Sequence, residues 1–340
     1  MYEKLVWVYF HHHARPLVFK ANLLMSQFVE ADFVVPLELS DKRIDHVMTE
    51  LMPDYSRSKL QQWIKQGKII INGQQLKPKE KIKVNDLIEV KAELESQGDW
   101  KAENIDIDIV YQDDDIIIIN KPTNMVVHPA VGNYTGTLVN ALLYHFPDIE
   151  AVPRAGIVHR LDKDTTGLMV VAKTLTAHAH IVEQLQSREM GREYETVVAG
   201  VMTSGGTINE PIARSTKNRK KMAVTPFGKK AVTHYRVLER FPAHTHIRVK
   251  LETGRTHQIR VHMSHIKRPI IGDSTYGGRF KLPPGVSSEL KEELQNFGRQ
   301  ALHAKKITLI HPKTQEEMSW ESELPDDMQS LLSNLAETKS

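Results

Sequence analysis

The chain has 340 residues, and its 45 Lys and Arg residues against 42 Asp and Glu residues leave a formal net charge of only +3. This length allows a sizeable core and two domains, whereas the total charge is too small to indicate a polyanionic partner. The lack of cysteine excludes disulfides, thiolate metal sites and cysteine nucleophiles. No apolar run approaches the roughly 18 residues that span a bilayer. We therefore expect a cytoplasmic protein that does not bind membranes.

The first 39 residues are expected to form an N-terminal extension that is partly disordered. The apolar run Leu5–Phe10 is too short for a signal peptide, because three histidines interrupt it at once. Ordinary globular sequence resumes near Met25, so the translation start could be Met1 or Met25.

Residues 40–92 are predicted to form a small domain of two helices and a hairpin. Apolar residues at helical spacing predict one helix within residues 40–51, and a second is expected between a Ser56 cap and Gly67. The Asn72-Gly73 pair follows an apolar run, which is a strong hairpin signal.

A polar segment, residues 93–104, is predicted to be a linker to a second domain at residues 105–327. In that domain strand-like runs alternate with few helices, the clearest of which is Thr176–Glu189. This order favours an α+β domain with a mixed, mostly antiparallel sheet. Residues 328–340 are expected to be a C-terminal tail.

The candidate site lies in IVHRLDKDTTGLMVVAK, Ile157–Lys173, where two apolar runs flank a loop that carries Asp162. Ionisable residues on a loop between rigid strands indicate a functional site. A buried carboxylate needs a compensating cation, and we expect Arg260 to supply it. Residues 254–262 read as a strand in which Arg260 faces away from its apolar neighbours. On the residues alone, a purely structural Asp–Arg bridge stays open.

The spacing His-Arg-Leu-Asp-x-x-Thr-x-Gly, from His159 to Gly167, resembles the signature of the RluA-type pseudouridine synthases. The resemblance implies isomerisation of uridine in RNA, with Asp162 as the catalytic carboxylate and Arg260 as its ion-pair partner. It also implies that Tyr194, in REYETVVAG, lies against the target base. Physically the ring could stack on uracil, although a core tyrosine is the ordinary alternative.

Arg160 is expected to fill the gap that a flipped uridine leaves in its stack, with a phosphate clamp as the alternative. The reaction is an isomerisation and no phosphate-cradling fingerprint is present, so we expect no cofactor, nucleotide or metal. The resemblance leaves two routes open for Asp162: attack on C1′, or removal of a proton from C2′.

Residues 40–92 resemble an S4 RNA-binding domain in the segments Arg43–Asp45, Ser56–Ser58, Asn72-Gly73 and Asp86–Val90. A second basic region, residues 212–236, contains eight Lys or Arg residues and no Asp or Glu. We expect the RNA contacts to come from Arg43, Arg57, Lys59, Lys65, Lys217, Arg219, Lys220 and Lys221. A protein-binding module and a solvated basic loop are the respective alternatives.

The segments DKDTTGLMVVAK and LETGRTHQIRVHM are most similar to family members that act on large-subunit RNA. This similarity implies a monomer whose partner is 23S rRNA or a large-subunit particle, and whose target is the hairpin at the intersubunit bridge. Alternatives are another rRNA site or tRNA, a non-catalytic assembly factor, and a Mg²⁺-dependent nuclease using residues 113–115. We read residues 113–115 as a solvated hairpin turn.

Overall fold

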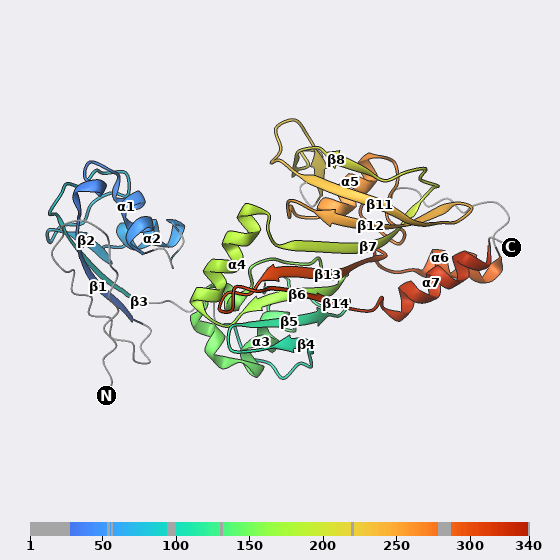
Figure 1. The fold of residues 1–340 in the computed structure, drawn as a ribbon, viewed down its shortest axis with the longest axis horizontal. Helices are drawn as coiled ribbons and strands as arrows, with labels where there is room; N and C mark the ends of the chain where they lie inside the picture. Colours follow the sequence, from blue (N-terminus) through green and yellow to red (C-terminus); the bar gives the residue numbers. More distant parts are fainter. Residues whose placement is uncertain are drawn as a thin grey trace. The chain divides into compact units, whose positions relative to one another are not determined.

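The structure is a computed structural model that describes residues 28–52, 55, 57–93, 100–129, 132–218, 221–277 and 287–338. The chain divides into two compact units, one ending at residue 98 and one beginning at residue 99, and each is described by itself (Figure 1). Of the extension expected at residues 1–39, residues 1–27 lie outside the described residues, and with them the choice between Met1 and Met25.

The first unit is a three-stranded antiparallel sheet, in the order β1-β3-β2, with two helices (Figure 1). Its buried residues form one core, in which Trp63 is 1% exposed. The elements are β1 (Phe28–Val34), η1 (Leu37–Leu39), α1 (Ile44–Leu51), α2 (Arg57–Lys65), β2 (Ile69–Ile71) and β3 (Leu87–Glu93).

The predicted domain boundary at residue 40 is wrong, because β1 belongs to this unit. β1 pairs with β3 along its whole length, and Phe33, Val35 and Leu39 are buried in the same core. The strand was hard to see because Glu30 and Asp32 interrupt a short apolar run that has the period of two of a half-buried strand.

The Asn72-Gly73 turn forms, with φ values of 50° and 76° that a type I′ hairpin turn requires. Only Ile71 and Gln74 bridge directly across it. The chain then leaves the sheet, and β2 pairs instead with the later strand β3. The hairpin signal therefore located the turn but not the strand partner.

The second unit contains a nine-stranded sheet with the order β4-β5-β6-β13-β7-β12-β11-β8, and β14 pairs with β13 outside this path. Only β6 and β13 run parallel, so the prediction of a mixed, mostly antiparallel sheet is confirmed. β9 and β10 form a separate pair. In chain order the elements are β4 (Asp108–Gln112), β5 (Ile116–Lys121), α3 (Leu138–His145), η2 (Pro147–Ala151), η3 (Pro153–Gly156), β6 (Thr166–Ala172), α4 (Leu175–Ser187), β7 (Gly191–Ala199), β8 (Gly206–Asn209), β9 (Ile212–Arg214), β10 (Met222–Val224), β11 (Val232–Arg240), β12 (His244–Leu251), α5 (Gln258–His265), α6 (Ser288–Asn296), β13 (Leu302–Ile310), β14 (Glu317–Glu321) and α7 (Asp326–Glu337).

Both faces of this sheet are buried around β5. Ile117 and Ile119 join the cluster that includes α3, whereas Ile116 and Ile118 join the cluster that includes α4. Because side chains alternate along a strand, the two clusters lie on opposite faces. This double burial explains the uninterrupted apolar run of β5, the strand next to the edge strand β4.

The second unit extends beyond the predicted limits of 105 and 327. Trp100 and Ile105 pack against its main core, so part of the predicted linker belongs to the folded unit. The predicted tail is helix α7, which buries Met328, Leu331 and Leu335. Figure 1 shows α6 and α7 side by side beyond the start of β13. Among the described residues, no helix combines the length and apolar character needed to cross a membrane.

Candidate active site

The loop that carries Asp162 is anchored from below by a buried lysine. The ammonium group of Lys121, which is 1% exposed, donates to the carbonyl oxygens of Pro122 at 2.7 Å, Met125 at 3.1 Å and Lys163 at 2.9 Å. Its three donors thus meet three acceptors, and burial lowers the pKa of Lys121 to about 8. Lys121 therefore supports the loop from inside the protein.

A second anchor, Arg299, connects the loop to the C-terminal helix α7. Arg299 makes a two-pronged ion pair with Asp327, at 2.6 and 2.7 Å, and its Nη1 donates to the carbonyl oxygen of Asp164 at 3.3 Å. Gln300 donates to the Thr165 hydroxyl at 2.9 Å. These contacts bring α7 into the support of the site and restrict the freedom of the Asp162 backbone.

Arg260 lies on a helix, α5, and the predicted strand at this position is wrong. His257 precedes the helix with a φ of 56°, and the Gln258 side chain bonds back to Thr253 and to the backbone of Arg255. Residues 258–263 are all buried. A helix buried on all sides shows no apolar stripe, so the alternation around Arg260 resembled a strand.

The Arg260 guanidinium links Asp162 to a second carboxylate, Asp273. Its Nη1 donates to Asp162 Oδ2 at 2.9 Å, while Nε and Nη2 donate to Asp273 at 2.7 and 3.0 Å. Asp273 also accepts the backbone N–H groups of Thr275 and Tyr276, each at 2.9 Å. Burial alone would lower the pKa of Arg260, but hydrogen bonding to Asp273 and the charge of both carboxylates raise it. Arg260 is therefore a permanently charged, fixed partner for Asp162.

The second oxygen of Asp162 is left open. Oδ1 lies 3.8 Å from Nε2 of His257, beyond hydrogen-bond distance, and the Asp162 side chain is 19% exposed. The other ring nitrogen of His257 is 2.8 Å from the hydroxyl of Tyr276. Burial is the main cause that lowers the pKa of His257, so a neutral ring faces this oxygen.

A cavity of about 420 Å³ opens in front of Asp162, and Arg160, Tyr194 and Arg260 line it as well. Tyr194, on β7, is 5% exposed, and burial together with the charge of Asp162 raises the pKa of its hydroxyl. Arg160 is exposed. The structure therefore gathers around one cavity the four residues that the sequence singled out for catalysis and base flipping.

His159, two residues before Leu161 in the motif, also lines this cavity. Its Nε2 accepts the backbone N–H of Val170 at 3.2 Å, so this nitrogen carries no proton. Burial, with the nearby charge of Arg192, lowers the pKa of His159 to about 3. His159 is thus a neutral group that ties the loop to β6.

Two of the residues expected to bind RNA from the first unit are held by a buried acid. Arg43 and Arg57 both pair with Asp45, at 3.0 and 2.7 Å, while each keeps 45% of its side chain exposed. The amine of Lys59 lies 5.6 Å from the centre of the Trp63 ring, and Lys65 is exposed.

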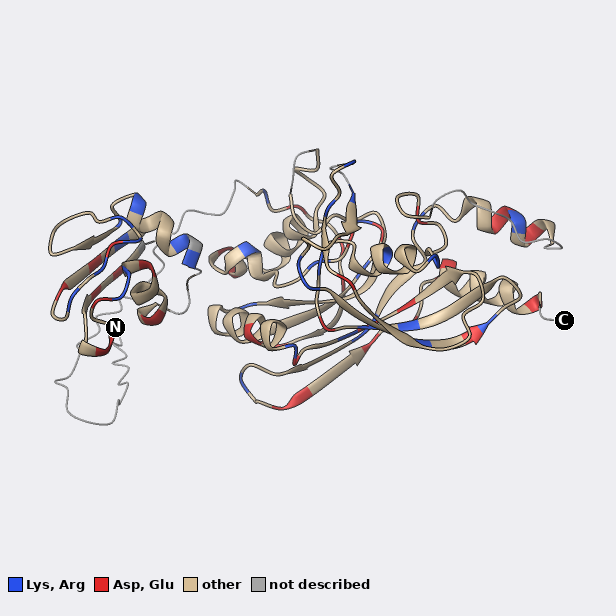
Figure 2. Ribbon diagram, turned by 90° about the horizontal axis from the view of Figure 1, so that it is seen from above, with Lys and Arg blue, Asp and Glu red and all other residues tan. Residues whose placement is uncertain are grey.

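The basic region at residues 212–236 divides into two kinds of residue. Lys217 is exposed, whereas the amine of Lys221 donates to the carbonyl of Thr275 and lies 5.9 Å from the Tyr276 ring. Lys221 therefore supports the turn that holds Asp273. Arg219 and Lys220 lie outside the described residues. Figure 2 shows basic and acidic segments on both units.

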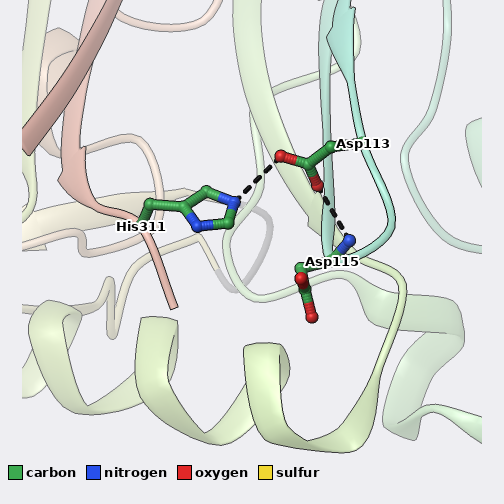
Figure 3. A group of neighbouring side chains, drawn as sticks. All are labelled: Asp113, Asp115 and His311. Carbon is green, nitrogen blue, oxygen red and sulfur yellow. Dashed lines mark hydrogen bonds and ion pairs between the residues drawn. The ribbon is translucent and has the colours of Figure 1, made fainter. Parts of the chain in front are cut away.

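Asp113, Asp115 and His311 lie close enough to suggest a metal site (Figure 3). Asp113 already accepts four hydrogen bonds, from the backbone of Asp115 and Ile116, the Tyr111 hydroxyl and His311 Nε2. The Nδ1 of His311 accepts backbone N–H groups at 3.2 and 3.1 Å. A metal would have to displace these bonds, so the cluster is a hydrogen-bonded turn. The turn joins β4 and β5, as the sequence predicted. It is not fully solvated, however, because His311 packs against it and bonds to Asp113.

Sequence reasoning missed the roles of His257 and Asp273. An Asp before Ser-Thr-Tyr typically bonds to the following backbone N–H groups, which is the signal that could have identified Asp273. His257 lies in the segment that was expected to be a strand. Both belong to the site only because α5 and the turn at Asp273 meet in space.

Comparison with known proteins agrees with this geometry. Residues 115–265 match the RNA pseudouridylate synthase family, and residues 42–88 match the S4 domain. The chain is 56% identical over 315 residues to the ribosomal large subunit pseudouridine synthase D of Pseudomonas aeruginosa, which covers 93% of this chain and 98% of that protein. It is 52% identical over 309 residues to the protein of the same name in Escherichia coli K12, covering 91% and 95%.

Among solved structures, human RNA pseudouridylate synthase domain containing 4 aligns with a TM-score of 0.54 and 26% identity, covering 67% of this chain and 93% of that chain. Human RNA pseudouridylate synthase domain containing 1 gives 0.52 and 25%, covering 68% and 89%. The chain therefore belongs to the RNA pseudouridine synthase family and carries an S4 domain in addition to its catalytic unit.

Proposed function

We propose that this protein isomerises uridines of 23S ribosomal RNA to pseudouridine, with Asp162 as the reacting group. The observation that carries the proposal is the chain of ion pairs Asp273–Arg260–Asp162. Arg260 neutralises the charge of Asp162 through one oxygen and leaves the other oxygen facing the cavity. A nucleophile or base needs such a free oxygen on a rigid support.

The reaction breaks the N1–C1′ bond, and the uracil rotates and rejoins the ribose through C5. Asp162 either attacks C1′ or removes a proton from C2′, and its open Oδ1 serves both routes. Tyr194, with a raised pKa, stays protonated at neutral pH and offers a planar face for the base. Arg160, exposed beside the cavity, would occupy the gap that the flipped uridine leaves.

The printed names of the bacterial relatives, which refer to the ribosomal large subunit, support the choice of RNA. Within that RNA, the sequence resemblance favours the hairpin at the intersubunit bridge. Arg43, Arg57 and Lys217 would supply phosphate contacts that position the substrate. A ribosomal substrate would place the protein in the cytoplasm. We also expect the protein to act as a monomer and to need no cofactor.

The test is to incubate the purified protein with unmodified 23S rRNA in EDTA and to map pseudouridine by carbodiimide-blocked primer extension. Asp162→Asn removes the proposed reacting group. Asp148→Asn is the matched control, because it removes the same charge from an exposed side chain in the same unit.

We expect new stops in the bridge hairpin with the wild type and with Asp148→Asn, and none with Asp162→Asn. Stops only at other positions of the 23S rRNA would contradict the proposed target. Bound RNA without any stop would favour the assembly factor, and cleavage that EDTA abolishes would favour the nuclease.

A further inference from the structure

The cavity contains a buried cation that the proposed reaction has not used, Arg192. It lies on β7 two residues before Tyr194, so both side chains point to the same face of the strand. Arg192 is 7% exposed and lines the cavity together with Tyr194 and Asp162. Its Nε has no hydrogen-bond partner among the described residues.

The opposite face of β7 shows what a satisfied charge looks like in the same strand. There the buried Glu195 accepts a hydrogen bond from Arg248 at 2.8 Å and lies 3.0 Å from Nε2 of His246. Burial would raise the pKa of Glu195, but its interactions with His246 and Arg248 lower it to about 2. Within the part of the chain that the structure describes, Arg192 has no carboxylate at ion-pair distance. A buried charge without a partner is costly and is typical of a site that meets its partner in the substrate.

The backbone is shaped to admit the guanidinium. Gly254 begins the segment before α5, and a Cβ at this position would lie 2.6 Å from Nη1 of Arg192. A larger residue would require the end of the Arg192 side chain to move. Gly254 thus leaves room for the guanidinium in its present position.

We propose that Arg192 donates hydrogen bonds to the carbonyl oxygens of the target uracil and stabilises the uracil anion that forms during the reaction. This inference rests on the proposed isomerisation. When the N1–C1′ bond breaks, its electron pair passes to uracil and spreads over N1, O2 and O4. C1′ meanwhile bonds to Asp162, or C2′ gives a proton to Asp162. C5 of the anion then bonds to C1′ while the Asp162–C1′ bond breaks, or while Asp162 returns the proton to C2′. The C5 proton then leaves to water, and N1 takes up a proton.

Burial favours the base over a phosphate as the ligand of Arg192. Arg260, the other buried arginine at the cavity, is already bonded to Asp162 and Asp273. Arg154, Arg160 and Arg255 are exposed and accessible to the strongly hydrated phosphates of an RNA backbone. Arg192 instead is buried and lines the cavity together with Tyr194 and Leu251. A planar carbonyl-bearing ring suits this surrounding, and a donor shielded from water stabilises developing negative charge more strongly than an exposed one.

The test measures single-turnover rates with RNA substrates that carry either uridine or 5-fluorouridine at the target position. The readout is loss of the N1-linked nucleoside, which does not depend on departure of the group at C5. We expect Arg192→Gln to slow uridine about 10²- to 10³-fold, as loss of one oxyanion donor does, with RNA affinity nearly unchanged. Because fluorine stabilises the anion, the ratio of wild-type to variant rates should shrink at least about tenfold with 5-fluorouridine.

Arg192→Lys keeps the charge but loses the planar fork, so it should recover part of the rate. Arg192→Lys also tests the proposal if Arg192→Gln fails to fold. Its remaining rate defect should likewise be smaller with 5-fluorouridine than with uridine. An equal defect with both substrates would overturn the proposal in favour of a structural role. Weakened RNA affinity with a normal rate at saturation would overturn it in favour of a phosphate ligand. Failure of the wild type to form pseudouridine would instead reject the proposed function.

Discussion

Asp45 in the first unit and Asp162 in the second each form an ion pair with arginine, yet their surroundings differ. Asp45 is fully buried and accepts hydrogen bonds from Arg43 at 3.0 Å on each oxygen, from Arg57 at 2.7 Å and from Gln61 at 2.6 Å. Asp162 accepts one side-chain bond, from Arg260, on a single oxygen.

The difference separates a structural carboxylate from the one that we propose as the reacting group. Burial would raise the pKa of Asp45, but its hydrogen bonds, those of Arg57 foremost, lower it to about 2. Asp45 has no oxygen left for a ligand, and it orients two arginines toward solvent. Asp162 shares its cation with Asp273, so Arg260 cannot turn to cover both Asp162 oxygens.

The largest expected effect is that of Asp162→Asn on catalysis. Loss of a reacting group lowers turnover by about 10³-fold or more, and we expect RNA affinity to stay near the wild-type value. Because Asp273 still neutralises Arg260, the free energy of unfolding should change by less than about 1 kcal/mol. Single-turnover kinetics, filter binding and urea denaturation measure the three quantities. If Asp162→Asn lost as much stability as Asp45→Asn, Asp162 would be a structural residue like Asp45.

Asp273→Asn should affect both stability and rate. Breaking a buried ion pair lowers the free energy of unfolding by roughly 3 kcal/mol, and Arg260 becomes free to turn onto the open oxygen of Asp162. We expect the rate to fall about 10²-fold, as a small misplacement near the reacting atoms does. Urea denaturation and single-turnover assays test this, with Asp148→Asn as the control. A normal rate in a destabilised protein would show that Asp273 does not position Arg260.

Asp45→Asn should change the acid stability of the first unit alone. The pKa of Asp45 is about 2 when folded, below its ordinary value of 3.8. Its contribution is therefore complete above pH 3.8 and is lost as the pH falls toward 2. Hydrogen exchange of α1 and α2 should show this loss in the wild type and in the exposed control Asp32→Asn. In Asp45→Asn, the amide protection of α1 and α2 should be lower at pH 7 and should change less as the pH falls from 3.8 to 2. An acid dependence like that of the wild type would contradict the structural role of Asp45.

The smallest effect is expected from Lys217→Gln in the exposed basic region. Loss of one phosphate contact should weaken RNA binding modestly and reduce the slope of log affinity against log salt by about 0.7 to 0.9. Lys221→Gln should instead lower stability, because the Lys221 amine supports the Asp273 turn. Equal salt slopes for Lys217→Gln and the wild type would remove Lys217 from the RNA contacts.

Much of this arrangement could be predicted from sequence because its signals are local. The loop of Asp162 lies between apolar runs, and the Asn72-Gly73 turn has its own conformational preference. The pairing of Asp162 with Arg260 could be expected through the family resemblance, although the strand expected around Arg260 is a helix. Complete burial of residues 258–263 removes the periodicity that distinguishes the two.

The parts that sequence could not supply depend on contacts between distant segments. Lys121 and Lys163 are 42 positions apart, and Arg299 and Asp164 are 135 apart. No local pattern reports such pairs. α7 was taken for a tail because a short amphipathic segment at a chain end looks the same whether or not it packs onto a core.

The most direct test of Asp162 as the reacting group uses RNA whose uridines carry tritium at C5. Pseudouridine formation turns C5 into the glycosidic carbon, so each conversion must release that tritium to water. We expect the wild type to release tritium in EDTA in proportion to the pseudouridine formed, and Asp162→Asn, at equal RNA occupancy, to release none. Release by Asp162→Asn at the wild-type rate would contradict the account.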